Sequence, residues 1–102
     1  MNAPQLFAAA VGACILEFVL NSCRLREIPV DHLDLELTCD LLERPHRIGP
    51  LAAVIHIQPE PPADVKKRLL GVARHATLAN TLARPPEVNI RFAGDRDGDK
   101  PL

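Results

Sequence analysis

The chain lacks tryptophan and tyrosine and contains only three phenylalanines among its 102 residues. Proteins that bind single-stranded nucleic acid commonly stack the bases on aromatic rings, so this scarcity argues against such a surface. Positive charge does not compensate, because twelve basic residues stand against thirteen acidic ones and the net charge is −1. A phosphate backbone is bound through clustered lysines and arginines. We therefore expect no nucleic acid among the partners.

Apolar runs long enough to cross a membrane are also missing. The longest run, Leu6 to Leu16, has eleven residues and ends at Glu17, whereas a transmembrane helix needs about 20. A secretory signal peptide carries basic residues before its apolar core, but the first basic residue of this chain is Arg24. We expect no membrane partner and a cytoplasmic location.

The chain has few cysteines and none of the short motifs of metal or cofactor sites. The three cysteines, Cys14, Cys23 and Cys39, form no CxxC pair, and an odd number does not predict a disulfide framework. The four histidines are far apart, with no pair at spacing i+3 or i+4, and a glycine-rich phosphate loop is absent. We expect a reducing compartment, no metal and no cofactor.

The sequence does contain a long apolar helix, predicted over residues 4–25. Pro4 suits the first turn, where its missing N–H would have no helical partner, and the next proline is Pro29. The helix is apolar nearly all the way round from Leu6 to Leu20, which is typical of a central helix. The remaining elements cannot cover it on every side, so we expect a homodimer in which a second copy covers the rest.

Two strands are predicted after this helix. Residues His32 to Leu41 alternate polar and apolar without interruption, which is typical of a half-buried strand. Its buried face would hold Leu33, Leu35, Leu37, Cys39 and Leu41. A turn around residues 44–47 follows, and Leu51–Gln58 is the expected antiparallel partner strand.

The last part of the chain predicts an amphipathic helix and a short strand. The helix begins at Ala63 and ends between Arg74 and Leu82, with one apolar stripe. Two prolines then introduce the strand Glu87–Phe92. Residues 1–93 are therefore expected to form a single α+β domain in the order helix, strand, strand, helix, strand, and the polar residues 94–102 a flexible tail.

Two segments resemble the OsmC/Ohr family, the osmotically inducible and organic hydroperoxide resistance proteins. The run Leu6–Cys14 is similar to the cysteine-bearing helix of that family, and Leu69–Val88 is similar to its second helix, including an Asn-Thr-Leu stretch at residues 80–82. The spacing and the order of elements agree over roughly residues 4–92. The resemblance implies an intertwined dimer in which two long central helices are wrapped by sheets.

The resemblance also implies a chemistry. In the family, the first cysteine is a peroxidatic thiolate that a hydroperoxide oxidises to a sulfenic acid, and the second resolves it as a disulfide that a dithiol reductant reopens. Cys14 matches the first position and is the candidate catalytic residue, whereas Ala76 stands at the second. Glu17, one turn after Cys14, would disfavour a thiolate by like-charge repulsion.

Two more parts of the family's site differ. The carboxylate that many members carry nine or ten residues before the first cysteine is replaced by Gln5 or Pro4. The thiolate-stabilising arginine comes, in the family, from a β-rich segment before the cysteine helix, and we expect this chain to be shortened by that segment. Cys39 is the only cysteine geometrically able to pair with Cys14, although core packing is the expected role of both.

Three functions stay open at this point. A catalytically degenerate member would act as a dimeric or ligand-binding module related to peroxide stress proteins, with a small hydrophobic ligand. An active member would be a thiol-dependent organic hydroperoxide peroxidase that uses Cys14. A KH-like RNA-binding module has a similar order of elements, but the GxxG loop that it requires is missing.

Overall fold

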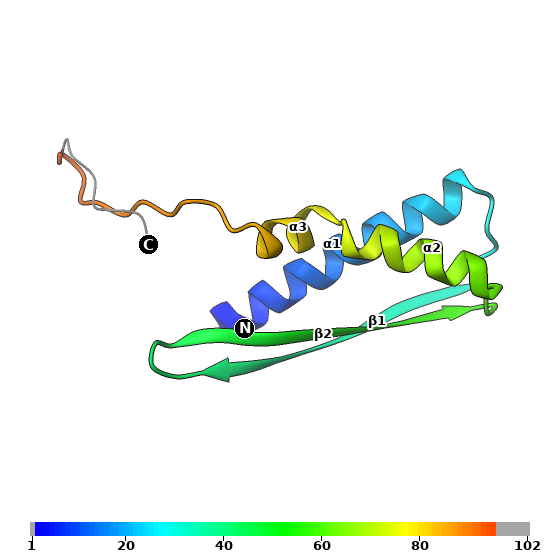
Figure 1. Ribbon diagram of the computed structural model, residues 1–102, viewed down its shortest axis with the longest axis horizontal. Helices are drawn as coiled ribbons and strands as arrows, with labels where there is room; N and C mark the ends of the chain where they lie inside the picture. Colours follow the sequence, from blue (N-terminus) through cyan, green and yellow to red (C-terminus); the bar gives the residue numbers. More distant parts are fainter. Residues whose placement is uncertain (1, 96–102) are drawn as a thin grey trace.

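The computed structural model describes residues 2–95, in which helices lie over one face of a β-hairpin (Figure 1). The elements are α1 (Ala3–Leu25), β1 (His32–Leu42), β2 (Arg47–Gln58), α2 (Ala63–Arg74) and α3 (Thr77–Ala83). The long helix α1 lies between the hairpin and α3, and α2 runs beside it (Figure 1). This arrangement confirms the predicted α+β class.

The helix α1 begins at a reciprocal cap. The Asn2 side chain accepts a hydrogen bond from the Gln5 N–H at 2.9 Å, and the Gln5 side chain accepts one from the Asn2 N–H at 3.1 Å. α1 also has the length and composition of a membrane-crossing helix. One of its faces packs against β1 and α2, so within residues 2–95 it serves as the core helix of the domain.

The hairpin has the predicted inward face over most of its length. β1 pairs antiparallel with β2, with Leu35 opposite Ile55 and Leu37 opposite Ala53. Leu33, Leu35 and Leu37 are half-buried and pack against the core. The alternation of the sequence therefore identified both the strand and the side that faces the helices.

The prediction for Leu41 was wrong. The register shifts between Cys39 and Leu41. Two residues of β2, Gly49 and Pro50, lie there against the single residue Asp40 of β1, so the extra residue is in β2. The alternation of β1 is interrupted at this bulge, so that Leu41 is 64% exposed and Leu42 is half-buried in its place. The partner strand also starts earlier than predicted, at Arg47.

The predicted second helix corresponds to α2, which begins at Ala63 and ends at Arg74, within the predicted range, and a separate short helix, α3, follows it. The N–H of His75 bonds to the carbonyls of Gly71 and Val72 at 3.2 Å, which closes α2. Ala76 then adopts an extended conformation, with φ −61° and ψ 150°, and α3 follows. The side-chain amide of Asn80 donates to the His75 carbonyl at 3.0 Å and so ties α3 to the end of α2.

The predicted strand Glu87–Phe92 is not a strand in this single chain. After α3 the chain runs extended away from the hairpin (Figure 1), and within residues 2–95 the sheet contains β1 and β2 alone. A strand requires a hydrogen-bonded neighbour, which this segment lacks. Val88, Ile90 and Phe92 are 42%, 59% and 85% exposed. Most of the predicted tail, residues 96–102, lies outside the described residues.

The core of one chain is small. Its buried apolar residues are Val11, Ile15, Val19, Cys23, Leu69, Ala73 and Ala76. The radius of gyration is 17.3 Å and the extents are 54 × 27 × 23 Å, whereas a compact domain of about 100 residues has a radius of gyration of about 13 Å. One chain is therefore elongated and leaves much apolar surface in contact with solvent.

Candidate functional site

Cys14, the predicted catalytic residue, lies near the middle of α1. Its side chain is half-buried and packs against the core cluster, and its thiol is free. Among residues 2–95, no hydrogen bond or ion pair involves this thiol. A thiolate is stabilised by a neighbouring cation or a helix N-terminus, and the described part of the chain places neither in contact with Cys14.

Ala76, the position of the family's second cysteine, lies at the corner between α2 and α3. It is 0% exposed and belongs to the same core cluster against which Cys14 packs. The corner is fixed by Asn80, whose side chain bonds to the carbonyl of His75, the residue before Ala76. The position that corresponds to the family's second cysteine is therefore buried in the core cluster that Cys14 contacts. In this chain that position carries the methyl group of Ala76 instead of a thiol.

Asn80 is the positioning residue that the sequence analysis did not single out. The signal was present, because Asn80 opens the Asn-Thr-Leu stretch that is similar to the family. An asparagine inside a helix has low helix propensity, since its amide competes for backbone groups. Here the Asn80 side-chain amide donates a hydrogen bond to the carbonyl of His75, at the end of the preceding helix.

The other two cysteines are packing residues in this structure. Cys23 is 1% exposed, and its burial raises the pKa of its thiol above the ordinary value because the thiolate would be desolvated. Cys39 is half-buried on the inward face of β1, opposite Leu51. All three cysteines are free. Cys39 has the predicted inward orientation, but it is not among the residues that pack against the core cluster.

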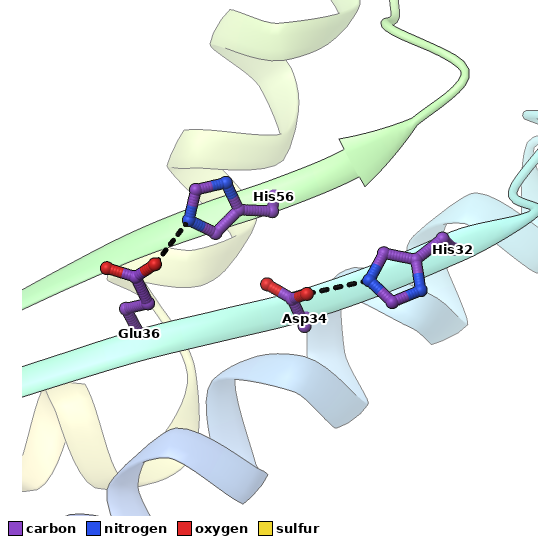
Figure 2. Close-up of polar contacts among 4 residues, drawn as sticks. All are labelled: His32, Asp34, Glu36 and His56. Carbon is purple, nitrogen blue, oxygen red and sulfur yellow. Dashed lines mark hydrogen bonds and ion pairs between the residues drawn. The ribbon is translucent and has the colours of Figure 1, made fainter.

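A polar cluster lies on the outer face of the hairpin (Figure 2). His56 Nε2 lies 3.1 Å from Glu36 Oε1, and His32 Nε2 lies 2.6 Å from Asp34 Oδ2 (Figure 2). All four side chains are largely exposed, and exposed pairs of this kind contribute at most about 1 kcal/mol. No metal-binding group of three or more His, Cys, Asp or Glu side chains occurs among residues 2–95. The cluster is best described as two surface pairs.

An open groove of about 370 Å³ lies between α1 and β1, and we call it the β1 groove. It is lined by Ala8, Ala9, Gly12, Ala13, Leu16, Leu35 and Leu37. Small residues on α1 create it, and a Cβ placed on Gly12 would still be 3.5 Å from Leu35 Cδ2. Cys14 does not line this groove.

Comparisons with known proteins place this geometry in a family. Residues 1–91 match the family model described as OsmC-like protein. The chain therefore belongs to the OsmC-like protein family, as its cysteine helix and its Asn-Thr-Leu stretch indicated. No curated protein sequence matches it. The match leaves the KH-like hypothesis without support.

Two solved structures share the fold. An osmotic stress induced and detoxification response protein from Psychrobacter arcticus 273-4 has a TM-score of 0.74 and 20% identity, over 78% of this chain and 58% of that one. An organic hydroperoxide resistance protein OsmC from Legionella pneumophila has a TM-score of 0.69 and 21% identity, over 80% of this chain and 61% of that one. The chain thus spans about three fifths of the length of these relatives.

Proposed function

We propose that this chain is a catalytically degenerate OsmC-like protein, a dimeric or ligand-binding module related to peroxide stress proteins. One observation carries the proposal: Ala76 is buried at the position where the family has its resolving cysteine. An alanine side chain cannot attack a sulfenic acid, so the chain has no internal route from oxidised Cys14 to a disulfide at this position.

Cys14 can still be oxidised once. Its thiolate sulfur would attack one oxygen of a small apolar hydroperoxide, the O–O bond would break, and the other oxygen would leave with a proton as an alcohol. The product is a sulfenic acid at Cys14, in which the sulfur has been oxidised and the peroxide reduced. Without a second thiol, the reaction stops after one equivalent.

The runner-up function is a thiol-dependent peroxidase, and the half-exposed position of Cys14 favours it. An external or partner thiol would then replace the missing cysteine by attacking the sulfenic acid, releasing water and forming a mixed disulfide. A dithiol would reduce that disulfide.

The homodimer is part of the proposal. The elongated shape of the single chain and its exposed apolar residues, among them Leu6, Ile90 and Phe92, support it. A cytoplasmic location is proposed as well, since the three free cysteines suit a reducing compartment.

The test has two parts: oxidation by cumene hydroperoxide without reductant, followed by intact-protein mass measurement, and a separate peroxidase assay in which dithiothreitol is the reductant. The first part measures how far the chain is oxidised by itself, and the second measures turnover. We expect oxidation to stop near one equivalent per chain, and Cys14→Ser to abolish it, while Cys39→Ser leaves it unchanged. Sustained turnover that Cys14→Ser removes would overturn the degenerate assignment and establish the peroxidase. No oxidation of Cys14 at all would leave only its packing role and support the binding module.

A further inference from the structure

A second apolar groove lies between β2 and α2, and we call it the β2 groove. Its volume is about 350 Å³, within the range of about 300–1,000 Å³ that is usual for small-molecule sites. It is lined by Ala53, Val54, Ile55, Ile57, Pro61, Lys66, Leu69 and Leu70. Cys14 is not one of these residues, so the β2 groove is separate from the candidate peroxidatic site.

The β2 groove has an apolar floor and an open side. Ile55 and Ile57 line it from β2 and pack against the core cluster, to which Leu69 of α2 belongs. Val54 and Leu70 also line it and are 52% and 45% exposed. The groove therefore presents apolar surface that an apolar ligand would remove from water.

A single cation accompanies this apolar lining. Among residues 2–95, Lys66 is the one charged residue that lines the β2 groove. The strand on the other wall, β2, contains no aspartate or glutamate. Small-molecule sites are typically apolar with a few polar groups that orient the ligand. The charge of Lys66 therefore favours a ligand with an apolar body and an anionic end.

The cation lies at one end of the groove. α2 runs back along β2 (Figure 1), so Lys66, near the start of α2, lies toward Ile57, whereas Leu70 lies toward Ala53. The four strand residues from Ala53 to Ile57 span about 13 Å. A straight chain of about ten carbons, with bonds of about 1.5 Å, has a similar length. The ligand that fits is therefore linear, with its charge at one end.

Glu60 is a competitor for the same cation. Lys66 Nζ donates a hydrogen bond to Glu60 Oε1, and both side chains are largely exposed. An exposed ion pair of this kind contributes little to stability, and an ammonium has three N–H donors. A ligand carboxylate can therefore join or displace Glu60 at Lys66, and the negative charge of Glu60 opposes its approach.

We propose that the β2 groove binds a free straight-chain monocarboxylate of medium length, with its chain along Ile55 and Ile57 and its carboxylate at Lys66. This inference rests on the proposed ligand-binding function and names the ligand class and the site. One ammonium balances one negative charge, which favours a carboxylate over a phosphate monoester, whose charge at pH 7 is about −1.5 to −2.

The direct test is isothermal titration calorimetry of the full chain with sodium decanoate, and with 1-decanol as the uncharged ligand of equal chain length. We expect one decanoate per chain. Lys66→Gln should weaken decanoate binding about tenfold, the effect of one hydrogen bond to a charged group, and leave decanol binding unchanged. The matched control is Lys67→Gln, since the neighbouring Lys67 does not line the groove, and it should leave both affinities unchanged.

Two further variants test the charge and the apolar wall. Glu60→Gln should strengthen decanoate binding, because it removes the competing carboxylate, whereas Glu43→Gln, at the far end of the hairpin, makes the same change in net charge and should have no effect. Leu70→Asp should weaken binding of both ligands. Its control is Leu82→Asp in α3, at a leucine of similar exposure, 43% against 45%, which should leave binding unchanged.

The outcomes separate this inference from the proposed function. Decanoate binding that neither Lys66→Gln nor Leu70→Asp weakens would place the ligand elsewhere, which overturns the inference but keeps the binding module. No decanoate binding would also overturn the inference, while the oxidation of Cys14 would still decide the degenerate assignment. Light scattering that shows a dimer in the wild type and a monomer in Leu70→Asp would mean that a second copy fills the groove, and the inference would again be wrong.

Discussion

Gly12 on α1 faces Leu35 on β1 with room for one methyl group: a Cβ at Gly12 would lie 3.5 Å from Leu35 Cδ2 and 3.9 Å from Leu37 Cδ1. Both distances are ordinary van der Waals contacts, so an alanine fits here without displacing the strand. The glycine is therefore not required by the packing of this chain. Its presence widens the β1 groove instead.

Gly12→Ala should raise the free energy of unfolding by about 0.5–1 kcal/mol, because alanine is the better helix former inside a helix. Urea unfolding at a fixed protein concentration measures the change. The matched control is Gly71→Ala in α2, where a Cβ would meet nothing within 4 Å and where propensity alone acts. If Gly12→Ala destabilises the protein while Gly71→Ala stabilises it, α1 and β1 are packed too tightly to accept the added methyl group.

Leu35→Asp should lower the free energy of unfolding by about 2–3 kcal/mol, since it places a carboxylate on the face of β1 that packs against the core. Thr38→Asp is the matched control on the exposed face of the same strand and should change stability by no more than about 0.5 kcal/mol. Thermal and urea unfolding of the three proteins test the register directly. Equal stability of Leu35→Asp and the wild type would mean that the strand is one residue out of register.

The alternation of β1 and the apolar composition of α1 could be read from sequence because each is a repeated pattern of side chains. Leu41 could not, because its orientation depends on a bulge at Gly49 and Pro50 of β2, and the predicted partner strand began only at Leu51. The segment Glu87–Phe92 is a related case. Its residues alternate as in a strand, but the predicted strand is absent, because a strand forms only with a hydrogen-bonded neighbour and the described part of the chain does not supply one.

In the candidate site, too, some features could be predicted from the sequence and others could not. Cys14 and Ala76 were located by resemblance, and the structure places both on one core cluster. The break between α2 and α3 was not predicted, because no proline or glycine marks residues 75 and 76. The break is accompanied by a hydrogen bond from the Asn80 side chain to the backbone carbonyl of His75, five residues earlier, and a single bond of this kind leaves no periodic pattern in the sequence.

Asn80→Asp should lower the free energy of unfolding by about 1 kcal/mol. The aspartate has the same size and shape but carries no N–H to donate to the His75 carbonyl. Thr81→Val is the control in the same helix, since it removes only the bond from the Thr81 hydroxyl to the carbonyl of Thr77 one turn back. Hydrogen exchange should report faster opening of α3 in Asn80→Asp than in Thr81→Val. Identical exchange in the two variants would show that Asn80 does not hold the corner.

The buried thiol of Cys23 predicts a loss of stability in alkali. Burial raises the pKa of Cys23 in the folded protein, whereas a cysteine in the unfolded chain has a pKa of about 8.5. Above that pH the unfolded chain releases the proton and the folded chain retains it, so the free energy of unfolding falls until the pH passes the folded pKa. Below the pKa of the unfolded cysteine, the contribution of Cys23 to the free energy of unfolding does not change with pH. Cys23→Ala should unfold without this slope and Cys39→Ala should keep it; a slope that survives in Cys23→Ala must come from another group.

Ala76→Cys should restore what the family's second position supplies. After one equivalent of cumene hydroperoxide, the sulfenic acid at Cys14 would be attacked by the new thiol, releasing water and forming an intrachain disulfide that dithiothreitol reduces. We expect a mass two hydrogens below the reduced protein and turnover that continues beyond one equivalent. Because the site is fully buried, the larger side chain should cost about 1–3 kcal/mol of stability.

Ala73→Cys, in the same buried cluster but inside α2, is the control for a thiol that is merely nearby and should give neither disulfide nor turnover. If both variants behave alike, or if Cys14 in Ala76→Cys proceeds to a sulfinic acid, the corner between α2 and α3 does not present its residue to Cys14.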